Sequence, residues 1–215
     1  MIIYLVISAL LLIVGYLLGS IPTGYIAGRY LMGIDIREHG SGSTGATNVL
    51  RTIGKVPAIA VLLIDMLKGA IALELVNLVY TFDLTLVPDN WKYWLIVATA
   101  FTAIIGHSKS IWLNFTGGKS VAITLGILLV MNPVVALGSL ATFLVFLAIF
   151  RIVSLSSIIA AIAVNVLTIA LHQPVPYVIF ALLAGAYVIL RHKTNIQRIS
   201  AGTEPQIGQT LQENN

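Results

Sequence analysis

The chain has 215 residues, of which 58% are hydrophobic and only 9% are charged. Soluble domains carry about 25% charged residues, so this composition excludes an ordinary soluble protein and indicates one that crosses a membrane several times. The sequence contains no cysteine, which excludes disulfides and thiolate-bound metals, and the meaning of its net charge of +4 depends on where the charges lie.

Apolar segments predict helices long enough to cross the bilayer, which takes about 20 residues. The first 28 residues carry no charge, and because no basic residue precedes the apolar run, we interpret it as a spanning helix rather than a signal peptide. In chain order, the clear segments are residues 1–18, 57–80, 93–106, 152–171 and 177–190.

The uncharged stretch 120–150 is too long for one ordinary span, because its 31 residues would make a helix of roughly 46 Å. A break at Asn132–Pro133 gives seven spans and places ten of the twelve Lys and Arg residues on one side, with Lys92 on the other and Lys68 inside a span. Without the break, the two sides would receive six and five. The positive-inside rule therefore favours an all-α integral membrane protein with seven transmembrane helices, its N-terminus outside and its C-terminus cytoplasmic.

This topology predicts one polytopic transmembrane domain over residues 1–199. Residues 200–215 are polar and rich in Gln and Thr, so they are expected to form a cytoplasmic tail with frayed structure.

The first cytoplasmic loop, "GSGSTGATNVLRTIG" (residues 40–54), is rich in glycine and hydroxyl side chains and carries one arginine. Glycine backbone N–H groups, small hydroxyls and a guanidinium together favour binding of a phosphate. A flexible turn or close helix packing would explain the glycines equally well. The candidate phosphate-binding residues of this loop are Gly40, Ser41, Gly42, Ser43, Gly45, Thr47, Asn48 and Arg51.

The second loop, "GHSKSIWLNFTGGKS" (residues 106–120), places Gly117 and Gly118 beside Lys119 on the same face. It is not a nucleotide P-loop, because that motif requires glycine where Leu113 stands. The pattern indicates a second anion subsite. His107 opens this loop, although a lone histidine is more often structural.

Two further cytoplasmic segments carry polar residues. In "RIVSLSS", Ser154 or Ser156 could cap the sixth spanning helix, and the helix N-terminus with Ser154 and Ser157 could also bind an anion. In "RHKTN", His192 and Asn195 would share one face if the last helix continued into the cytoplasm. A simple positive stop-transfer cluster is the alternative for this segment.

Asp65 and Lys68 lie three residues apart inside the second span, where charges are costly and should face the bundle. A structural ion pair is one interpretation, and a proton or ion path, which would favour a transporter, is the other. The loops carry few carboxylates and no cluster of His and Cys, so no metal and no cofactor are expected.

The motifs "GSGSTGATNVLR", "GH…FTGGKSVA", "VSLSSI" and "RHKTNIQRISAGTEP", with "DMLKG" in the second span, resemble those of the bacterial acyl-phosphate:glycerol-3-phosphate acyltransferases. This resemblance covers nearly the whole chain in order. It implies seven helices in the bacterial inner membrane and an active site on the cytoplasmic face. It also implies transfer of a long acyl chain from acyl phosphate to glycerol 3-phosphate, giving lysophosphatidic acid and phosphate, with no nucleic-acid partner.

The resemblance assigns the functional positions to Ser41, Arg51, Lys119, His192 and Asn195. The chain departs from the family pattern at Ser43, Ser110, Thr116 and Ser120, where the family usually has Asn, Pro, a basic residue and often Gly. The loss of a cation at position 116 is expected to weaken phosphate binding.

The expected mechanism is direct attack of a glycerol hydroxyl on the acyl phosphate, because the sequence offers no Ser/His/Asp arrangement for an acyl-enzyme. Phosphate is a good leaving group, so the enzyme mainly brings two substrates together. The substrate phosphate is expected to accept the proton, with His192 as the second choice. The rival hypotheses are a transporter or flippase for an anionic substrate, a divergent paralogue with altered substrate, and a structural membrane subunit.

Overall fold

The computed structural model describes residues 2–82 and 87–209, and within these ranges the chain is helical and forms no strand. The α-helices, in chain order, are α1 (Ile2–Ser20), α2 (Thr23–Met32), α3 (Ala46–Thr52), α4 (Lys55–Thr81), α5 (Lys92–Ser108), α6 (Val121–Met131), α7 (Pro133–Phe150), α8 (Val153–Ala170), α9 (Val175–Arg191) and α10 (Lys193–Ser200). Short 3₁₀ turns are η1 (Ile36–Glu38), η2 (Asp89–Trp91) and η3 (Ile111–Leu113).

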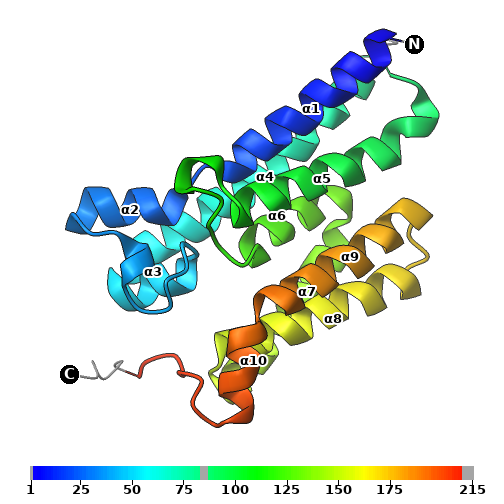
Figure 1. The fold of residues 1–215 in the computed structure, drawn as a ribbon. Coiled ribbons are helices and arrows are strands. Elements are labelled where there is room, and N and C mark those ends of the chain that lie inside the picture. The colour runs from blue at the N-terminus through cyan, green and yellow to red at the C-terminus, as the bar shows by residue number, and fades with distance from the viewer. Residues whose placement is uncertain (1, 83–86, 210–215) are drawn as a thin grey trace.

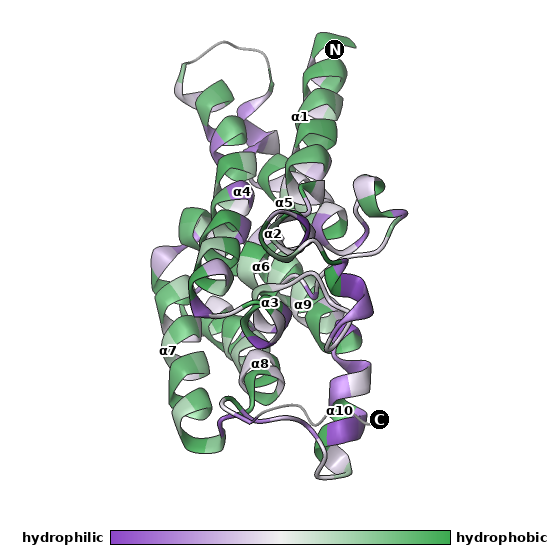
Figure 2. Ribbon diagram, turned by 90° about the vertical axis from the view of Figure 1, so that its left-hand side faces the viewer, coloured by the Kyte–Doolittle hydropathy of each residue, from purple (hydrophilic) through white to green (hydrophobic). Residues whose placement is uncertain are grey.

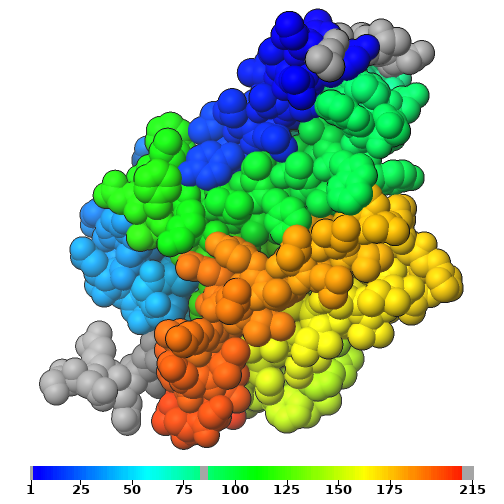
Figure 3. Space-filling view, turned by 45° about the vertical axis from the view of Figure 1, so that its right-hand side comes forward, coloured from blue at the N-terminus to red at the C-terminus, as the bar shows by residue number. Residues whose placement is uncertain are grey.

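The long helices form two groups that lie side by side (Figure 1). In the first group, α1 packs against α5 and α4, and α4 packs against α6. In the second group, α8 packs between α7 and α9. Contacts from α6 to α7 and from α5 to α9 join the groups. In the space-filling view, α9 lies beside α8 and runs down to α10, while α1 lies at the opposite edge (Figure 3).

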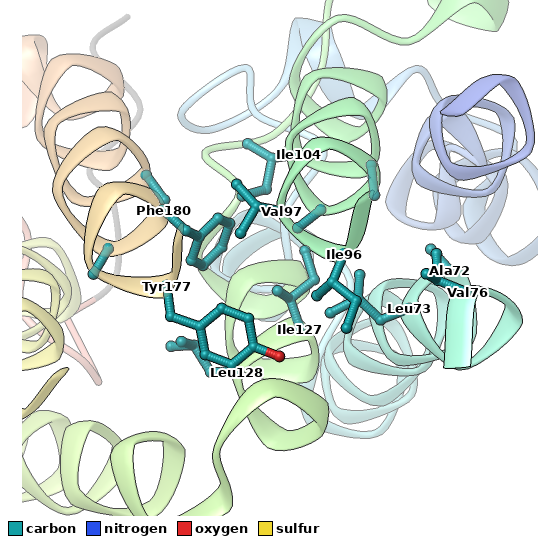
Figure 4. Close-up of a cluster of buried hydrophobic side chains, with 14 of the residues drawn as sticks. Ala72, Leu73, Val76, Ile96, Val97, Ile104, Ile127, Leu128, Tyr177 and Phe180 are labelled. Atoms are coloured by element: carbon teal, nitrogen blue, oxygen red, sulfur yellow. The ribbon is translucent and has the colours of Figure 1, made fainter. Parts of the chain in front are cut away.

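The main hydrophobic core lies where α9 meets α5 and α6. Phe180, which is fully buried, and Tyr177 point from α9 toward Ile104 and Val97 of α5 and toward α6 (Figure 4). On the other side of α5, Ile96 faces Leu73 of α4 (Figure 4). This packing explains why α5, though short, is held in the centre of the bundle.

Glycines allow two of the helix pairs to approach closely. A side chain at Gly19 of α1 would collide with the backbone of Ala103 on α5, and one at Gly126 of α6 would collide with the backbone of Met66 on α4. Small residues at such crossings are typical of helices that associate in a membrane, where close van der Waals packing replaces the hydrophobic effect.

The helices overlap all seven predicted spans, and the predicted helix break at Asn132–Pro133 is confirmed. The Asn132 side chain accepts hydrogen bonds from the backbone N–H groups of Val134 and Val135, and Pro133 opens α7. Among the residues that the structure describes, three segments qualify as spans by length and apolar composition, namely Ile2–Met32, Pro133–Phe150 and Val153–Ala170, and the bent pair α9–α10 would add a fourth. The protein is therefore an all-helical chain with membrane-crossing segments, and the count of seven stays a prediction.

Three short helices, α2, α3 and α10, were not predicted, and α3 and α10 carry residues of the polar end of the molecule, described below. Figure 2 shows that α10 is among its most hydrophilic elements, whereas α1 and α7 are almost wholly apolar. Helix α9 does not continue straight into α10, because the two meet at an angle of 60° at His192.

The prediction of a frayed tail is wrong for Glu204, Pro205 and Ile207, which bind other parts of the molecule, while the other residues from 201 to 209 are exposed. Glu204 is buried, Pro205 accepts a hydrogen bond from Arg51, and the carbonyl of Ile207 accepts one from Arg151. Polar composition suggested disorder, but these long-range partners could not be read from the sequence. Residues 210–215 lie outside the described ranges.

Candidate active site

A polar cavity of about 140 Å³ lies at the end of the bundle where the basic residues gather. It is walled by the first loop with α3, by the Lys119 loop, by the start of α8 and by the α9–α10 junction. Its polar lining residues are Ser41, Ser43, Thr47, Asn48, Arg51, Asp65, His107, Lys119, Ser120, Ser154, Ser157, His192, Asn195 and Glu204.

Asn48 holds the first loop together. Its side-chain amide donates hydrogen bonds to the carbonyls of Ile36, His39 and Ser43, and its oxygen accepts one from the backbone N–H of Ser41. Both N–H groups of the side chain are thus engaged, with three acceptors for two hydrogens, and the residue is 1% exposed. Asn48 consequently shapes the loop that presents Ser41 and Ser43, rather than offering a free donor to a ligand.

Gly40 and Gly42 let the chain turn around this asparagine. Their φ angles are +60° and +66°, in the left-handed region that glycine adopts without strain. A side chain at Gly40 would also collide with the Asn48 oxygen. The turn ends at Gly45, and α3 then carries Thr47 and Arg51 on its cavity side.

Arg51 is the cation of the first loop. It lies partly buried in the cavity wall, and one of its terminal nitrogens donates to the Pro205 carbonyl at 3.2 Å. Burial lowers the pKa of Arg51, and the nearby Glu204 carboxylate opposes this change. An arginine stays charged in proteins, so Arg51 offers its remaining N–H groups to an anion.

Lys119 is the cation of the second loop, and a hydrogen-bonded series anchors it. Its Nζ donates to Asn195 Oδ1 at 2.6 Å, and Asn195 Nδ2 donates to Glu204 Oε1 at 2.6 Å. Ser154 and Arg198 donate to the same carboxylate at 2.7 and 2.6 Å. The tail residue Glu204 therefore links α8, α10 and the Lys119 loop.

The pKa values of both charged residues in this series are lowered, which disfavours the charged form of Lys119 and favours the charged form of Glu204. Burial lowers the pKa of Lys119 to about 8, with Glu204 acting against this change and three arginines adding to it. Burial alone would raise the pKa of Glu204, but hydrogen bonds from Asn195, Ser154 and Arg198 hold it below its ordinary value. At neutral pH the lysine is mostly protonated and the glutamate is ionised.

His192 lies at the α9–α10 junction and is 3% exposed. Its Nδ1 lies 2.7 Å from the Val188 carbonyl, which can only accept, so Nδ1 carries the proton and Nε2 is left as an acceptor. Burial lowers the pKa of His192 to about 4, although the bond to Val188 acts in the other direction. The ring is therefore neutral at pH 7.

Gly117 and Gly118 of the second loop do not line the cavity but fix the position of this loop. Arg191 donates to the carbonyls of Gly117 and Gly118 at 3.4 and 3.0 Å, which ties the loop to the end of α9. The N–H of Gly118 donates to the His107 carbonyl, and a side chain at Gly118 would collide with the His107 ring. These glycines permit close packing that brings Lys119 into the cavity.

The predicted intramembrane pair lies next to the cavity. Lys68 Nζ is 2.8 Å from Asp65 Oδ1, and both side chains are almost fully buried. Thr23 donates to the same oxygen at 2.6 Å, and His107 Nδ1 lies 3.6 Å from it. Asp65 and His107 form part of the cavity wall, whereas Lys68 does not.

The serines of the third motif do not cap α8, because Ile152 is its N-cap residue and makes no side-chain cap bond. Ser154 instead donates to Glu204, while Ser156 and Ser157 donate to backbone carbonyls four residues earlier. The cap interpretation of Ser154 and Ser156 is therefore wrong. Ser154 and Ser157 line the cavity, and Ser156 does not.

A second, larger and mostly apolar groove of about 1410 Å³ adjoins the polar cavity. It runs between α3 and α4 on one side and α6, α7 and α8 on the other, and Gly40 lies in its wall. The residues common to both walls are Ala46, Thr47, Arg51, Leu62, Val121, Ala122, Phe143, Val153 and Ser157. A molecule with a polar head and a long apolar chain could occupy both spaces at once.

The structure brings most of the predicted site residues into one cavity, with a few exceptions. Gly42, Gly117 and Gly118 line neither space and support the loops. The sequence reasoning missed Glu204, Arg191 and Arg198. Only the ending "AGTEP", quoted for its resemblance, pointed toward Glu204.

The structure places two residues of the second loop that depart from the family pattern, Thr116 and Ser120. Thr116 is exposed and lies outside the cavity wall, with its hydroxyl 3.5 Å from a terminal nitrogen of Arg37. The expected loss of a phosphate-binding cation at position 116 therefore has no support from its location. Ser120 has φ +65°, a conformation that explains why glycine suits this position.

Within residues 2–82 and 87–209, no group of three or more His, Asp or Glu side chains could hold a metal ion. The polar lining of the cavity consists of two cations, two carboxylates, two imidazoles, two amides and several hydroxyls.

Comparison with known proteins adds independent information. A family model described as glycerol-3-phosphate acyltransferase matches residues 9–202. A glycerol-3-phosphate acyltransferase of Rippkaea orientalis is 68% identical over 208 residues, covering 96% of each chain. One from Crocosphaera subtropica is 60% identical over 208 residues, covering 96% of this chain and 97% of the other.

Two solved structures are also similar. Both are crystal structures of PlsY (YgiH), described as an integral membrane glycerol 3-phosphate acyltransferase, and both are 35% identical to this chain. The glycerol 3-phosphate form has a TM-score of 0.84 and covers 94% of this chain and 96% of its own. The lysophosphatidic acid form has a TM-score of 0.82 and covers 95% and 96%.

Proposed function

This chain belongs to the glycerol-3-phosphate acyltransferase family, and from that membership we propose how its cavity and groove carry out the reaction. The protein is an integral membrane acyltransferase that acts on glycerol 3-phosphate and yields lysophosphatidic acid. The donor, the site residues and the membrane orientation are the proposed parts.

The observation that carries the proposal is the junction of a small cationic cavity with a large apolar groove. Arg51 and Lys119 supply two positive charges and Ser41 supplies a hydroxyl around the same space, whereas the hydroxyl protons of Ser154 and Ser157 already bind Glu204 and the Val153 carbonyl. Such groups bind phosphate oxygens through charge-assisted hydrogen bonds. Asn195 positions Lys119, and Glu204 holds Asn195 in place.

The proposed donor is a long-chain acyl phosphate, with its acyl chain in the groove and its phosphate in the cavity. The reacting carbonyl would then lie at the shared wall, beside Thr47 and Arg51. A phosphate leaving group suits a polar space of about 140 Å³, whereas the nucleotide part of coenzyme A is much larger. Holding both substrates in this geometry can remove about 7–11 kcal/mol from the barrier.

The proton of the attacking hydroxyl goes to a substrate phosphate oxygen in this proposal. A phosphate monoester has its second pKa near about 6. The pKa of His192, which burial lowers to about 4, makes the free imidazole a weaker base than the phosphate. His192 Nε2 instead accepts a hydrogen bond from a substrate hydroxyl and helps to orient it.

The donor can be tested with purified protein in lipid. Labelled glycerol 3-phosphate is offered with palmitoyl phosphate in one sample and palmitoyl-CoA in the other. Lysophosphatidic acid formed only with palmitoyl phosphate supports the proposal. Product formed equally well from palmitoyl-CoA contradicts the proposed donor, and no product in either sample would favour a divergent paralogue or a transporter.

The proposed location is the bacterial inner membrane, with seven spans and the cavity on the cytoplasmic face. The clustering of basic residues at the cavity end supports this orientation. Because the chain has no cysteine, single cysteines introduced at Lys92 and Lys193 can report the two sides. A membrane-impermeant thiol reagent added to whole cells should label position 92 and spare position 193, and the reverse pattern would invert the topology.

A further inference from the structure

The wall of the polar cavity carries groups of both charge signs. Arg51 and Lys119 are its cations, while Asp65 on α4 is one of its two carboxylates, the other being Glu204. Asp65 is 0% exposed, and its Oδ1 accepts from Thr23 and Lys68 at 2.6 and 2.8 Å. Its Oδ2 is buried without any hydrogen-bond partner among the described residues. A buried carboxylate oxygen is normally paired, so an unpaired one beside a cavity points to a ligand.

The surroundings of Asp65 suit a neutral hydrogen-bond donor and not a phosphate. Lys68, which is 4% exposed, balances the charge of the carboxylate at 2.8 Å. The carboxylate nevertheless has no proton to donate and would repel phosphate oxygens. A substrate with a phosphate at one end and hydroxyls at the other would therefore place its phosphate toward Arg51 and Lys119 and a hydroxyl toward Asp65.

The position of Asp65 indicates which hydroxyl it would bind. The reacting hydroxyl must reach the acyl carbonyl, which the proposed function places at the wall shared with the groove. Leu62 belongs to that shared wall, but Asp65 lines only the cavity. It lies three residues further along α4, about 4.5 Å along the helix axis.

We propose that Asp65 Oδ2 accepts a hydrogen bond from the non-reacting 2-hydroxyl of glycerol 3-phosphate and so sets the orientation of this substrate. The inference rests on the proposed function, because it assumes where the carbonyl lies. Asp65 is then a specificity-determining residue, and its pairing with Lys68 keeps the carboxylate available as an acceptor. The geometry thus gives the predicted structural ion pair a second role.

Two analogues test this assignment on the unmodified enzyme. In 3-hydroxypropyl phosphate, the 2-hydroxyl is missing, so Oδ2 stays unpaired, and kcat/KM should fall by roughly 10- to 100-fold. In dihydroxyacetone phosphate, a carbonyl oxygen replaces that hydroxyl and faces the carboxylate oxygen, so this analogue should react more slowly still. The expected order is glycerol 3-phosphate, then 3-hydroxypropyl phosphate, then dihydroxyacetone phosphate.

A double variant tests whether Asp65 causes this order of substrate preference. The double substitution Asp65→Leu with Lys68→Met removes the acceptor together with its counter-charge, so no charge is left unpaired in the bundle. The preference for glycerol 3-phosphate over 3-hydroxypropyl phosphate should shrink to within about threefold. Glu74→Gln is the matched control, because Glu74 is an exposed carboxylate of the same helix outside both walls, and it should keep the wild-type preference.

The outcomes separate this inference from the proposed function. Failure of the wild-type enzyme to acylate glycerol 3-phosphate would count against the proposed function itself. Normal acylation without preference over 3-hydroxypropyl phosphate, or faster use of dihydroxyacetone phosphate than of 3-hydroxypropyl phosphate, would overturn the role of Asp65. An unchanged preference in a folded double variant would overturn it as well. If the double variant does not fold, the order of the three substrates on the wild-type enzyme still decides.

Discussion

The polar cavity and the apolar groove share a wall but are held together in different ways. In the cavity, a series of single directional hydrogen bonds holds the side chains, with Lys119 donating to Asn195 and Asn195 donating to Glu204, each at 2.6 Å. In the groove, many aliphatic side chains from α4, α6, α7 and α8 form the wall together. Directional bonds fail when one member is lost, whereas apolar packing is spread over many weak contacts. We therefore expect single substitutions to act strongly in the cavity and gradually in the groove.

The largest expected effect comes from removing a cavity cation. Arg51→Ala and Lys119→Ala should each lower kcat/KM for glycerol 3-phosphate by about a thousandfold, because each removes a charged donor from the phosphate. Steady-state kinetics on purified protein would measure this loss. Lys55→Ala is the matched control, because Lys55 is an exposed cation in the groove wall and should matter little. Equal losses in all three variants would remove the distinction between cavity and groove.

The pH dependence should also come from the cavity. Phosphate binding needs protonated Lys119, whose pKa of about 8 in the free protein predicts a fall of kcat/KM above that pH. Glu204 helps to keep this pKa up, so Glu204→Gln should move the alkaline limb to lower pH. In Lys119→Arg the group stays charged, and the alkaline limb should vanish even if the rate is lower. A pH–rate profile with the same limb in all three proteins would contradict this origin.

The apolar helices that line the groove were predictable, but the cavity was predictable only in part. Residue types and order placed Ser41, Arg51, Lys119, His192 and Asn195 on one face, because the positive-inside rule decides which loops meet. Asn48 was given a ligand-binding role, since its bonds to three loop carbonyls depend on a backbone fold that a sequence pattern does not specify. Glu204 was missed because a polar ending looks disordered until its partners on α8 and α10 are known.

The helices, like the cavity, were predictable from the sequence only in part. The long apolar segments and the break at Asn132–Pro133 follow from hydropathy and from the backbone chemistry of proline. The bend of 60° between α9 and α10 has no comparable signal, because no proline or glycine stands at His192. After that bend, α10 contacts both α8 and α9, and its Arg198 donates to Glu204.

A substitution in the groove wall is expected to have a smaller effect on kcat/KM than the loss of a cavity cation. Ala161→Phe on α8 adds a ring to the groove wall and should lower kcat/KM for palmitoyl phosphate about tenfold relative to lauroyl phosphate, because fewer methylene groups can be buried. The KM for glycerol 3-phosphate should stay the same. Ala170→Phe is the control, since Ala170 is exposed on the same helix outside the groove. A change in glycerol 3-phosphate affinity without a change in chain preference would mean that Ala161 belongs functionally to the cavity.

The smallest effect is expected just outside the cavity, at position 116, where the resemblance described in the sequence analysis implied a cation. Thr116→Lys restores that charge, yet Thr116 is exposed, lies outside the cavity wall and is next to Arg37. Exposed charges are screened over a Debye length of about 8 Å at physiological salt, so the KM for glycerol 3-phosphate should change less than about twofold. Titrating salt sharpens the test, because any gain at low ionic strength should disappear near 0.15 M, about the physiological level. A large, salt-resistant drop in KM would instead place position 116 in the phosphate site and extend the cavity to the outer rim of the second loop.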